Sequence, residues 1–213
     1  SDVYKRQHMY ICVHTKINIL FKTLQNIGKG VYKEKGSKFY AYAYPCQSID
    51  KVKEHLERLR KENPGCVHVC YAYCLGSKKE DYRYSDDGEP SNSAGAPIYG
   101  QIKSFELTNV LIAVVRYYGG TNLGVGGLIN AYRTAAKEAV LNTVIIEDED
   151  RRTIELSFSY AAMPFVMNEV KSSDCIILEQ HFEDRPMLKL SVPISNSFLI
   201  GKLKNMNEVL IKA

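Results

Sequence analysis

Residues 84–132 read YSDDGEPSNSAGAPIYGQIKSFELTNVLIAVVRYYGGTNLGVGGLINAY. This stretch joins an acidic turn, a long apolar segment, a glycine-rich loop and the start of a helix. Five of the 14 glycines of the chain lie within residues 119–127, which is denser than a loop needs in order to turn. Either a ligand or another part of the protein must therefore approach this backbone closely.

A buried strand, a tight loop and a helix are predicted in the second half of the stretch. Residues 110–118 are rich in β-branched and apolar side chains, as in strands that are covered on both faces. Gly119 and Gly120 end this strand, and the apolar side chains of residues 126–141 then recur at helical spacing. We therefore expect a strand at 110–118 and a helix at about 126–141.

The glycine-rich loop is a candidate binding site. Backbone N–H groups beside a helix N-terminus are suited to holding phosphate. Gly119 and Gly124 have the spacing of a P-loop, but Val125 and Gly126 stand where Lys and Ser or Thr are needed,. The loop binds an anion or an RNA backbone, or its glycines allow tight packing and left-handed turns. The candidate binding residues are Arg116, Tyr118, Gly119, Gly120, Asn122, Gly124, Gly126 and Gly127.

Arg116 lies near the end of the predicted strand among apolar neighbours, where an unpaired guanidinium would be costly. Either it pairs with a carboxylate of the acidic turn, or it reaches the surface and holds an anion. We favour the internal pair, because the two motifs bracket the same strand and a bidentate pair would fix the acidic turn to the glycine loop.

Four residues are candidates for catalysis, namely His68, Asp86, Asp87 and Glu89. Their side chains are ligand types that suit magnesium or manganese. The alternative hypothesis for the function is therefore a metal-dependent hydrolase of peptides or phosphoesters. Their spacing matches no established metal motif, and the neighbouring cysteines are too far apart along a strand to close around one zinc ion. We expect buried thiols, no metal site and no cofactor.

The chain holds 15 tyrosines against 7 phenylalanines and no tryptophan. Around residues 32–44 these tyrosines interleave with lysines, and residues 38–44 alternate in the way of a strand with two unlike faces,. Such a pattern is typical of an amphipathic sheet face, and it also suits rings that stack on nucleobases. The sequence leaves both interpretations open.

Two domains are predicted from charge and element order. Residues 1–141 hold 20 Lys and Arg against 13 Asp and Glu, whereas residues 142–213 hold 8 against 11, which indicates two units of different surface character. We expect an extension or tail at 1–20, an N-terminal domain at 21–142, a charged linker at 143–152 and a C-terminal domain at 153–213. The last of these is predicted to follow the order β-α-β-β-α-β, which is typical of a ferredoxin-like fold.

The apolar runs of the chain are shorter than the roughly 18 residues that a membrane helix needs. The first residues lack the pattern of a secretory signal, and six cysteines without such a signal suit a reducing compartment. We therefore expect a cytoplasmic protein with no membrane partner.

The chain resembles the IMPACT/YigZ family. The resemblance is carried by GVYKEKGSKFYAYAYP at 30–45, VHVCYAY at 67–73, YSDDGEPSNSAGAPI at 84–98 and above all VVRYYGGTNLGVGGLINAY at 114–132, and it extends over about residues 22–213. The sequence departs from the family pattern at Asn92 and Ser93, where Gly and Thr are common. It departs again at Asn122, Val125 and Asn130, where a basic residue, Thr and Arg are common, and these changes remove positive charge and hydroxyl groups from the glycine loop.

The resemblance implies an α+β protein. Its N-terminal α/β domain would be of the elongation-factor-G domain IV type, and its C-terminal domain would be ferredoxin-like, βαββα(β), similar to domain V of that factor. Family members are cytoplasmic, and the eukaryotic ones regulate translation under amino-acid starvation by competing for the activator of a kinase that bacteria lack. We therefore expect a regulator of translation or stress response that binds RNA, the ribosome or a translation-linked protein through its basic N-terminal domain.

Overall fold

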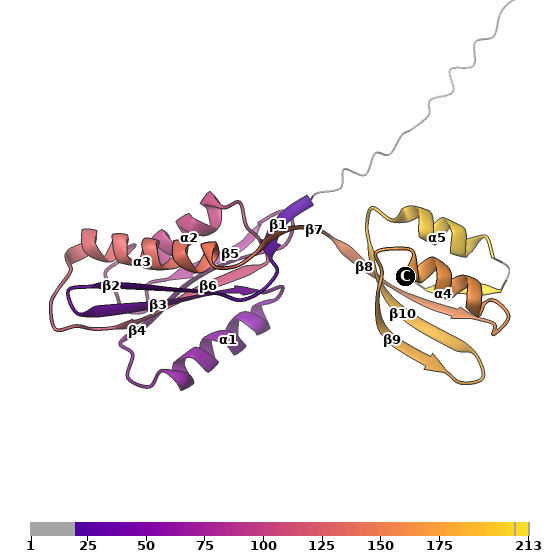
Figure 1. Cartoon of the computed structure of the whole chain (residues 1–213), viewed down its shortest axis with the longest axis horizontal. Coiled ribbons are helices and arrows are strands. Elements are labelled where there is room, and N and C mark those ends of the chain that lie inside the picture. Colours follow the sequence, from indigo (N-terminus) through magenta and orange to yellow (C-terminus); the bar gives the residue numbers. More distant parts are fainter. Residues whose placement is uncertain (1–19, 207, 213) are drawn as a thin grey trace, which may run out of the picture. The chain divides into compact units, whose positions relative to one another are not determined.

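The structure is a computed structural model that describes residues 20–206 and 208–212 (Figure 1). The predicted tail at 1–20 lies outside the described residues except for Leu20. The chain divides into two compact units between Asp150 and Arg151. Each unit has its own hydrophobic core and is described by itself.

The N-terminal unit is built on a five-stranded antiparallel sheet in the order β2-β3-β6-β4-β5. Helix α1 packs on one face of the sheet, and α2 and α3 cover the other (Figure 1). The bounds are β2 Gly28–Glu34, β3 Ser37–Pro45, α1 Ile49–Glu62, β4 His68–Leu75, β5 Asp81–Ser85, α2 Gly95–Ser104, β6 Val110–Tyr117 and α3 Gly124–Leu141. The predicted apolar strand at 110–118 is therefore the central strand β6, and all of its residues except Tyr117 are buried.

Strand β2 was not expected from the sequence, because two of its residues are glycines. Both glycines face α3 at very close range. A Cβ on Gly28 would collide with the carbonyl oxygen of Ala139, and a Cβ on Gly30 would lie 2.5 Å from the backbone nitrogen of Ala139. The missing side chains that weaken the strand pattern are therefore what lets α3 lie on the sheet.

A two-stranded antiparallel ribbon joins β1 (Leu20–Leu24) to β7 (Ile145–Glu149). Residues 143–152, which we expected as a linker, thus hold a strand and the first residues of β8. The charged run EDEDRR shows no strand pattern, because its carboxylates lie on a short two-stranded ribbon that is only half-buried. Strand β5 forms one exposed edge of the five-stranded sheet. The stacking of Tyr82 and Tyr84 on Tyr99 of α2, with ring centroids 4.8 and 5.8 Å apart, fixes this exposed edge strand.

The C-terminal unit follows the expected order β-α-β-β-α-β. Its antiparallel sheet has the order β11-β8-β10-β9, and α4 and α5 contribute to one core with it. The bounds are β8 Arg151–Phe158, α4 Met163–Lys171, β9 Ile176–Phe182, β10 Pro186–Pro193, α5 Ser197–Lys204 and β11 Val209–Lys212. Within the described part of the chain, none of the helices has the length and apolar character that crossing a bilayer would need.

Candidate functional site

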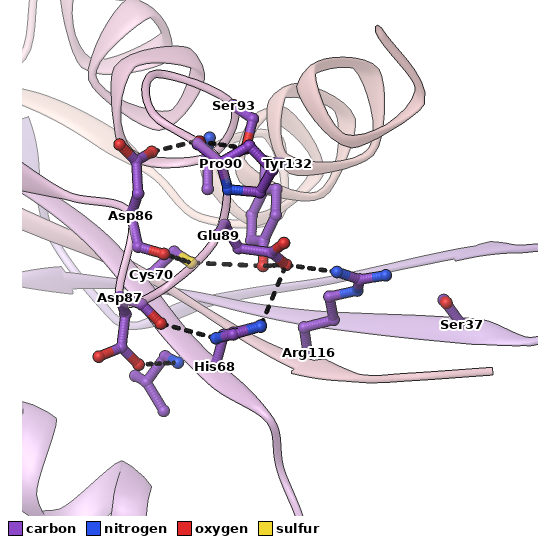
Figure 2. A network of polar contacts seen from close by, with 12 residues as sticks. Ser37, His68, Cys70, Asp86, Asp87, Glu89, Pro90, Ser93, Arg116 and Tyr132 are labelled. Carbon is purple, nitrogen blue, oxygen red and sulfur yellow. Dashed lines mark hydrogen bonds and ion pairs between the residues drawn. The ribbon is translucent and has the colours of Figure 1, made fainter. Parts of the chain in front are cut away.

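Glu89 is the centre of a buried polar network at the acidic turn (Figure 2). Its Oε1 atom lies 2.5 Å from Nη1 of Arg116 and accepts a hydrogen bond of 2.7 Å from the hydroxyl of Tyr132. The side chains of Glu89 and Arg116 are only 3% and 8% exposed. The favoured prediction, an internal pair between Arg116 and the acidic turn, is therefore confirmed, and the alternative of a surface anion ligand is not what the arginine does here.

The pair differs from the predicted bidentate geometry. One guanidinium nitrogen contacts one carboxylate oxygen, and Nε of Arg116 is buried with no hydrogen-bond partner among the described residues. Oε1 of Glu89 is shared with Tyr132 and faces Nε2 of His68 at 3.9 Å. The arginine also lies over the rings of Phe39 and Tyr118, at 5.5 and 5.6 Å from their centroids. Aromatic faces thus add to the stabilisation of its charge.

Two neutral donors complete the network. Burial raises the pKa of the Cys70 thiol and of the Tyr132 hydroxyl far above their usual ranges. Sγ of Cys70 lies 3.0 Å from the backbone oxygen of Asp86 and 3.3 Å from the Tyr132 hydroxyl. Both groups therefore stay protonated at neutral pH, and Cys70 is an inert buried thiol rather than a nucleophile.

Asp86 caps helix α2. Its Oδ1 atom accepts hydrogen bonds from the backbone N–H groups of Ala94 and Gly95, at 3.0 and 2.8 Å, and its Oδ2 atom accepts one of 2.8 Å from Asn92. A carboxylate at a helix N-terminus satisfies donors that the helix leaves free and interacts well with the helix dipole. The chemistry available to Asp86 is consequently that of a cap.

Asp87 ties the turn to two other elements. Its carboxylate accepts a hydrogen bond from the N–H of Val69 and pairs with Arg60 of α1, both at 2.7 Å. Its backbone oxygen lies 2.6 Å from Nδ1 of His68. Because a carbonyl oxygen only accepts, Nδ1 of His68 carries the proton of this bond. The imidazole is thereby held with Nε2 facing Glu89.

The hydrolase hypothesis gains no support from this geometry. Each of the three carboxylates that it requires is already engaged, Asp86 by α2, Asp87 by Arg60 and Val69, and Glu89 by Arg116. Across residues 20–206 and 208–212, no three His, Cys, Asp or Glu side chains are grouped so that they could hold one metal ion. His68 of β4 does meet Asp87 and Glu89 at the acidic turn, whereas the Asp86 carboxylate is directed at the start of α2.

The glycine loop leads from β6 into α3. A Cβ on Gly119 would collide with the backbone of Gly36, and the N–H of Gly119 donates a hydrogen bond of 3.1 Å to Oγ of the buried Ser37. Gly120 and Gly124 adopt φ angles of +82° and +72°, which favour glycine. Packing and left-handed turns therefore account for these three glycines.

The remaining loop candidates have looser surroundings. The Tyr118 hydroxyl donates to Oδ1 of Asn122 at 3.2 Å. A Cβ on Gly126 would meet no other atom within 4 Å, whereas a Cβ on Gly127 would lie 3.0 Å from Cβ of Leu123. Helix α3 begins after Leu123 without a side-chain cap.

A groove on the face of the sheet that carries α1 was not located from the sequence. We name it the tyrosine groove. It has a volume of about 430 Å³, and its walls are Tyr40, Tyr42, Tyr117 and Tyr118 together with Gly36, Lys38 and Asn63. The interleaving of tyrosines and lysines indicated this face, but the contribution of Asn63 required knowledge of where α1 ends.

Known proteins resemble the chain along most of its length. The family model "Impact N-terminal domain" matches residues 35–140. "IMPACT family member YvyE" of Bacillus subtilis is 28% identical over 162 residues, which cover 76% of this chain and 75% of that protein. "IMPACT family member YigZ" of Escherichia coli is 27% identical over 161 residues, which cover 75% and 79%.

A solved structure described as a hypothetical protein has the same fold. It superposes with a TM-score of 0.69 at 24% identity, covering 91% of this chain and 97% of that one. The matched region of the family model contains the acidic turn, β6 and the glycine loop. On these grounds the chain belongs to the IMPACT family.

Proposed function

We propose that this chain regulates translation by contacting RNA, the ribosome or a translation-associated protein through its N-terminal unit. Family membership supports the link to translation, since the eukaryotic members of the family are regulators of that process. The acidic turn supports a binding role rather than catalysis, because its ionisable side chains serve to hold α1, α2 and β6 in place.

The observation that carries the proposal is the charge on one face of the N-terminal sheet. Lys29, Lys33 and Lys38 are exposed on β2 and β3, on the face that carries α1. The described interactions give none of the three a carboxylate partner. Unpaired lysines on an open sheet face attract phosphate-bearing partners, and such binding weakens steeply with salt.

The finer fold assignments belong to the same proposal. We infer a ferredoxin-like C-terminal unit, which the order β-α-β-β-α-β and the sheet order β11-β8-β10-β9 support. The N-terminal unit would be of the elongation-factor-G domain IV type, and the glycine loop would lie on its binding surface. We also place the protein in the cytoplasm, in keeping with the free thiols of the five described cysteines.

Co-sedimentation with purified ribosomes tests the proposed function. The full chain is centrifuged with ribosomes through sucrose at several salt concentrations, and its effect on a reporter mRNA is measured in a cell-free translation extract. We expect binding at low salt that falls as salt rises, together with a change in reporter yield. A chain that stays in the supernatant at every salt concentration and leaves the yield unchanged would contradict the proposal.

A further inference from the structure

Helix α1 packs on β4 and β6, and its His55 stacks on Tyr44 near the end of β3, while β2 and the first half of β3 stay uncovered on the same face. On this face β2 presents two lysines and a valine, and β3 presents one lysine and two half-buried tyrosines. Three directly opposite pairs form this surface, and they are Lys29 with Tyr42, Val31 with Tyr40, and Lys33 with Lys38. Neither strand presents an acidic side chain here, because Glu34 faces α3 and accepts a hydrogen bond from Tyr32.

The tyrosine groove lies next to these lysines and is held in shape by its own side chains. The rings of Tyr40 and Tyr117 meet edge to face, at 5.9 Å and 87°. The Tyr117 hydroxyl donates to Oδ1 of Asn63 at 2.9 Å, and Nδ2 of Asn63 donates to the backbone oxygen of Leu59 at 2.8 Å. The last turn of α1 thereby fixes one wall, so the rings lose little freedom when a ligand binds.

Charge around the groove is polarised. Lys38 lines the groove and lies opposite both Lys33 and Tyr117 in the sheet. On the α1 side, the negative charge of Glu62 adds to burial in raising the pKa of Tyr42. A ligand with one anionic edge and one neutral flat edge would therefore place its anionic edge on the β2 side and its rings against the tyrosines.

We propose that the tyrosine groove and the adjoining Lys29, Lys33 and Lys38 bind single-stranded RNA. Bases stack on the tyrosine rings, which tolerate any sequence, and the backbone phosphates lie on the lysines. The groove volume of about 430 Å³ is within the usual range of small-ligand sites,. The choice of RNA among nucleic acids rests on the proposed function in translation. The argument from the stacking surface and its charge is independent of that function.

Binding of a fluorescein-labelled ten-nucleotide uridine RNA to the full chain tests this proposal. We expect Lys33→Glu combined with Lys38→Glu to weaken binding at least tenfold. The salt slope should fall by roughly 1.4, or about 0.7 for each phosphate that a lysine no longer neutralises. Arg133→Glu combined with Lys137→Glu makes the same change of charge on exposed residues of α3, on the opposite face. This matched control should weaken binding much less.

A second variant separates stacking from charge. Tyr40→Leu keeps an apolar side chain but removes the ring, and it should weaken binding by roughly tenfold, the lower part of the range for one base stack. Because the chain has 15 tyrosines and no tryptophan, its intrinsic fluorescence reports on tyrosine alone. RNA should quench this fluorescence in the wild type and quench it less in Tyr40→Leu. Urea unfolding of each variant checks that the fold is kept.

Several outcomes would overturn the proposal. The first is absence of RNA binding at low salt, and the second is equal weakening of RNA binding in the groove and control variants. The third is a decaglutamate peptide that binds as tightly as the RNA, which would indicate an acidic protein partner. If the groove variants bind RNA as tightly as the wild type while the wild type sediments with ribosomes, the groove proposal fails and the proposed function stands. If RNA binds in the groove while translation is unaffected, the proposed function fails and the groove proposal stands.

Discussion

Arg116 and Glu89 carry opposite charges at a place almost without solvent. The cost of removing both from water is offset by their close approach of 2.5 Å, by the Tyr132 hydroxyl and by two aromatic faces. Taking away one partner leaves the other buried and unpaired, which is more costly than the pair is worth. The pair therefore fixes the acidic turn to β6, the central strand.

Glu89→Gln should lower the free energy of unfolding by about 3–5 kcal/mol, because it leaves the guanidinium without its counter-charge. Urea denaturation followed by circular dichroism measures this change. Glu106→Gln is the control, since Glu106 pairs with Lys22 at the surface with an exposed fraction of 67% and its replacement should cost far less. Equal destabilisation of the two variants would refute the role given to the buried pair.

Cys70 makes the stability of the protein fall at alkaline pH. Burial raises the pKa of its thiol in the folded chain, while the unfolded thiol ionises near pH 8.5. Above this pH the folded state therefore keeps a proton that the unfolded state loses. The contribution of Cys70 to the free energy of unfolding is complete below about pH 8.5, and it falls by about 1.4 kcal/mol per pH unit above that pH. Tyr132 adds to this decline above about pH 10 for the same reason,.

The measurement compares wild type with Cys70→Ala under reducing conditions. Between about pH 8.5 and 9.5 the unfolding free energy of the wild type should fall by about 1 kcal/mol more than that of the variant. Parallel pH profiles would mean that Cys70 ionises equally well in the folded and unfolded chains.

Helix α2 depends on a single carboxylate at its start. The Asp86 carboxylate accepts hydrogen bonds from the backbone N–H groups of residues 92, 94 and 95. We expect Asp86→Ala to cost about 2 kcal/mol, the upper part of the range for removing a cap, and Asp86→Asn to cost clearly less because it keeps an acceptor oxygen. Hydrogen exchange should become faster at the amides of Ala94 and Gly95 in Asp86→Ala. Unchanged exchange there would show that another group caps the helix.

The packing of α3 on β2 depends on glycine. Gly30→Ala places a methyl group 2.5 Å from the backbone of Ala139, so α3 must shift, at a cost of about 1–3 kcal/mol. Gly126→Ala, in open space at the start of the same helix, should be neutral or stabilise by up to about 1 kcal/mol. Thermal unfolding of both variants checks the contrast. A Gly30→Ala variant as stable as Gly126→Ala would contradict the close packing.

Elements with a clear hydrophobic period were predictable from the sequence, and others were not. The apolar run of β6, the helical spacing of α3 and the order of the C-terminal elements were all visible in the chain. Strands β2, β5 and β7 were missed because most of their residues are exposed, charged or glycine, and the short β1 was missed although Phe21 and Leu24 are buried. These strands are specified by their partners, Tyr99 for β5 and Ala139 for β2, which local patterns do not contain.

At the candidate site the sequence indicated which residues meet but not what they do. His68, Asp87 and Glu89 do come together with Arg116, whereas the carboxylate of Asp86 is directed at α2. Whether a carboxylate is free or engaged depends on backbone N–H groups and on Arg60 of α1, which no side-chain pattern reveals. The tyrosine groove needed the position of α1 for the same reason.

For the whole molecule, we assign recognition to the N-terminal unit. The polar network at the acidic turn fixes α1, α2 and β6. The sheet face beside α1 presents lysines and tyrosine rings to a partner. The rigid network therefore serves as a scaffold, and we propose that the open face is the binding surface.

Ultraviolet crosslinking of the full chain to ribosomes, followed by mass spectrometry of the nucleotide-bearing peptides, would show which surface meets the partner. We predict crosslinked nucleotides on peptides that contain residues 38–44 or 117–118, at reduced yield in the Lys33→Glu and Lys38→Glu double variant. Crosslinks confined to peptides from residues 151–212, with the same yield in the double variant, would contradict the assignment of recognition to the N-terminal unit.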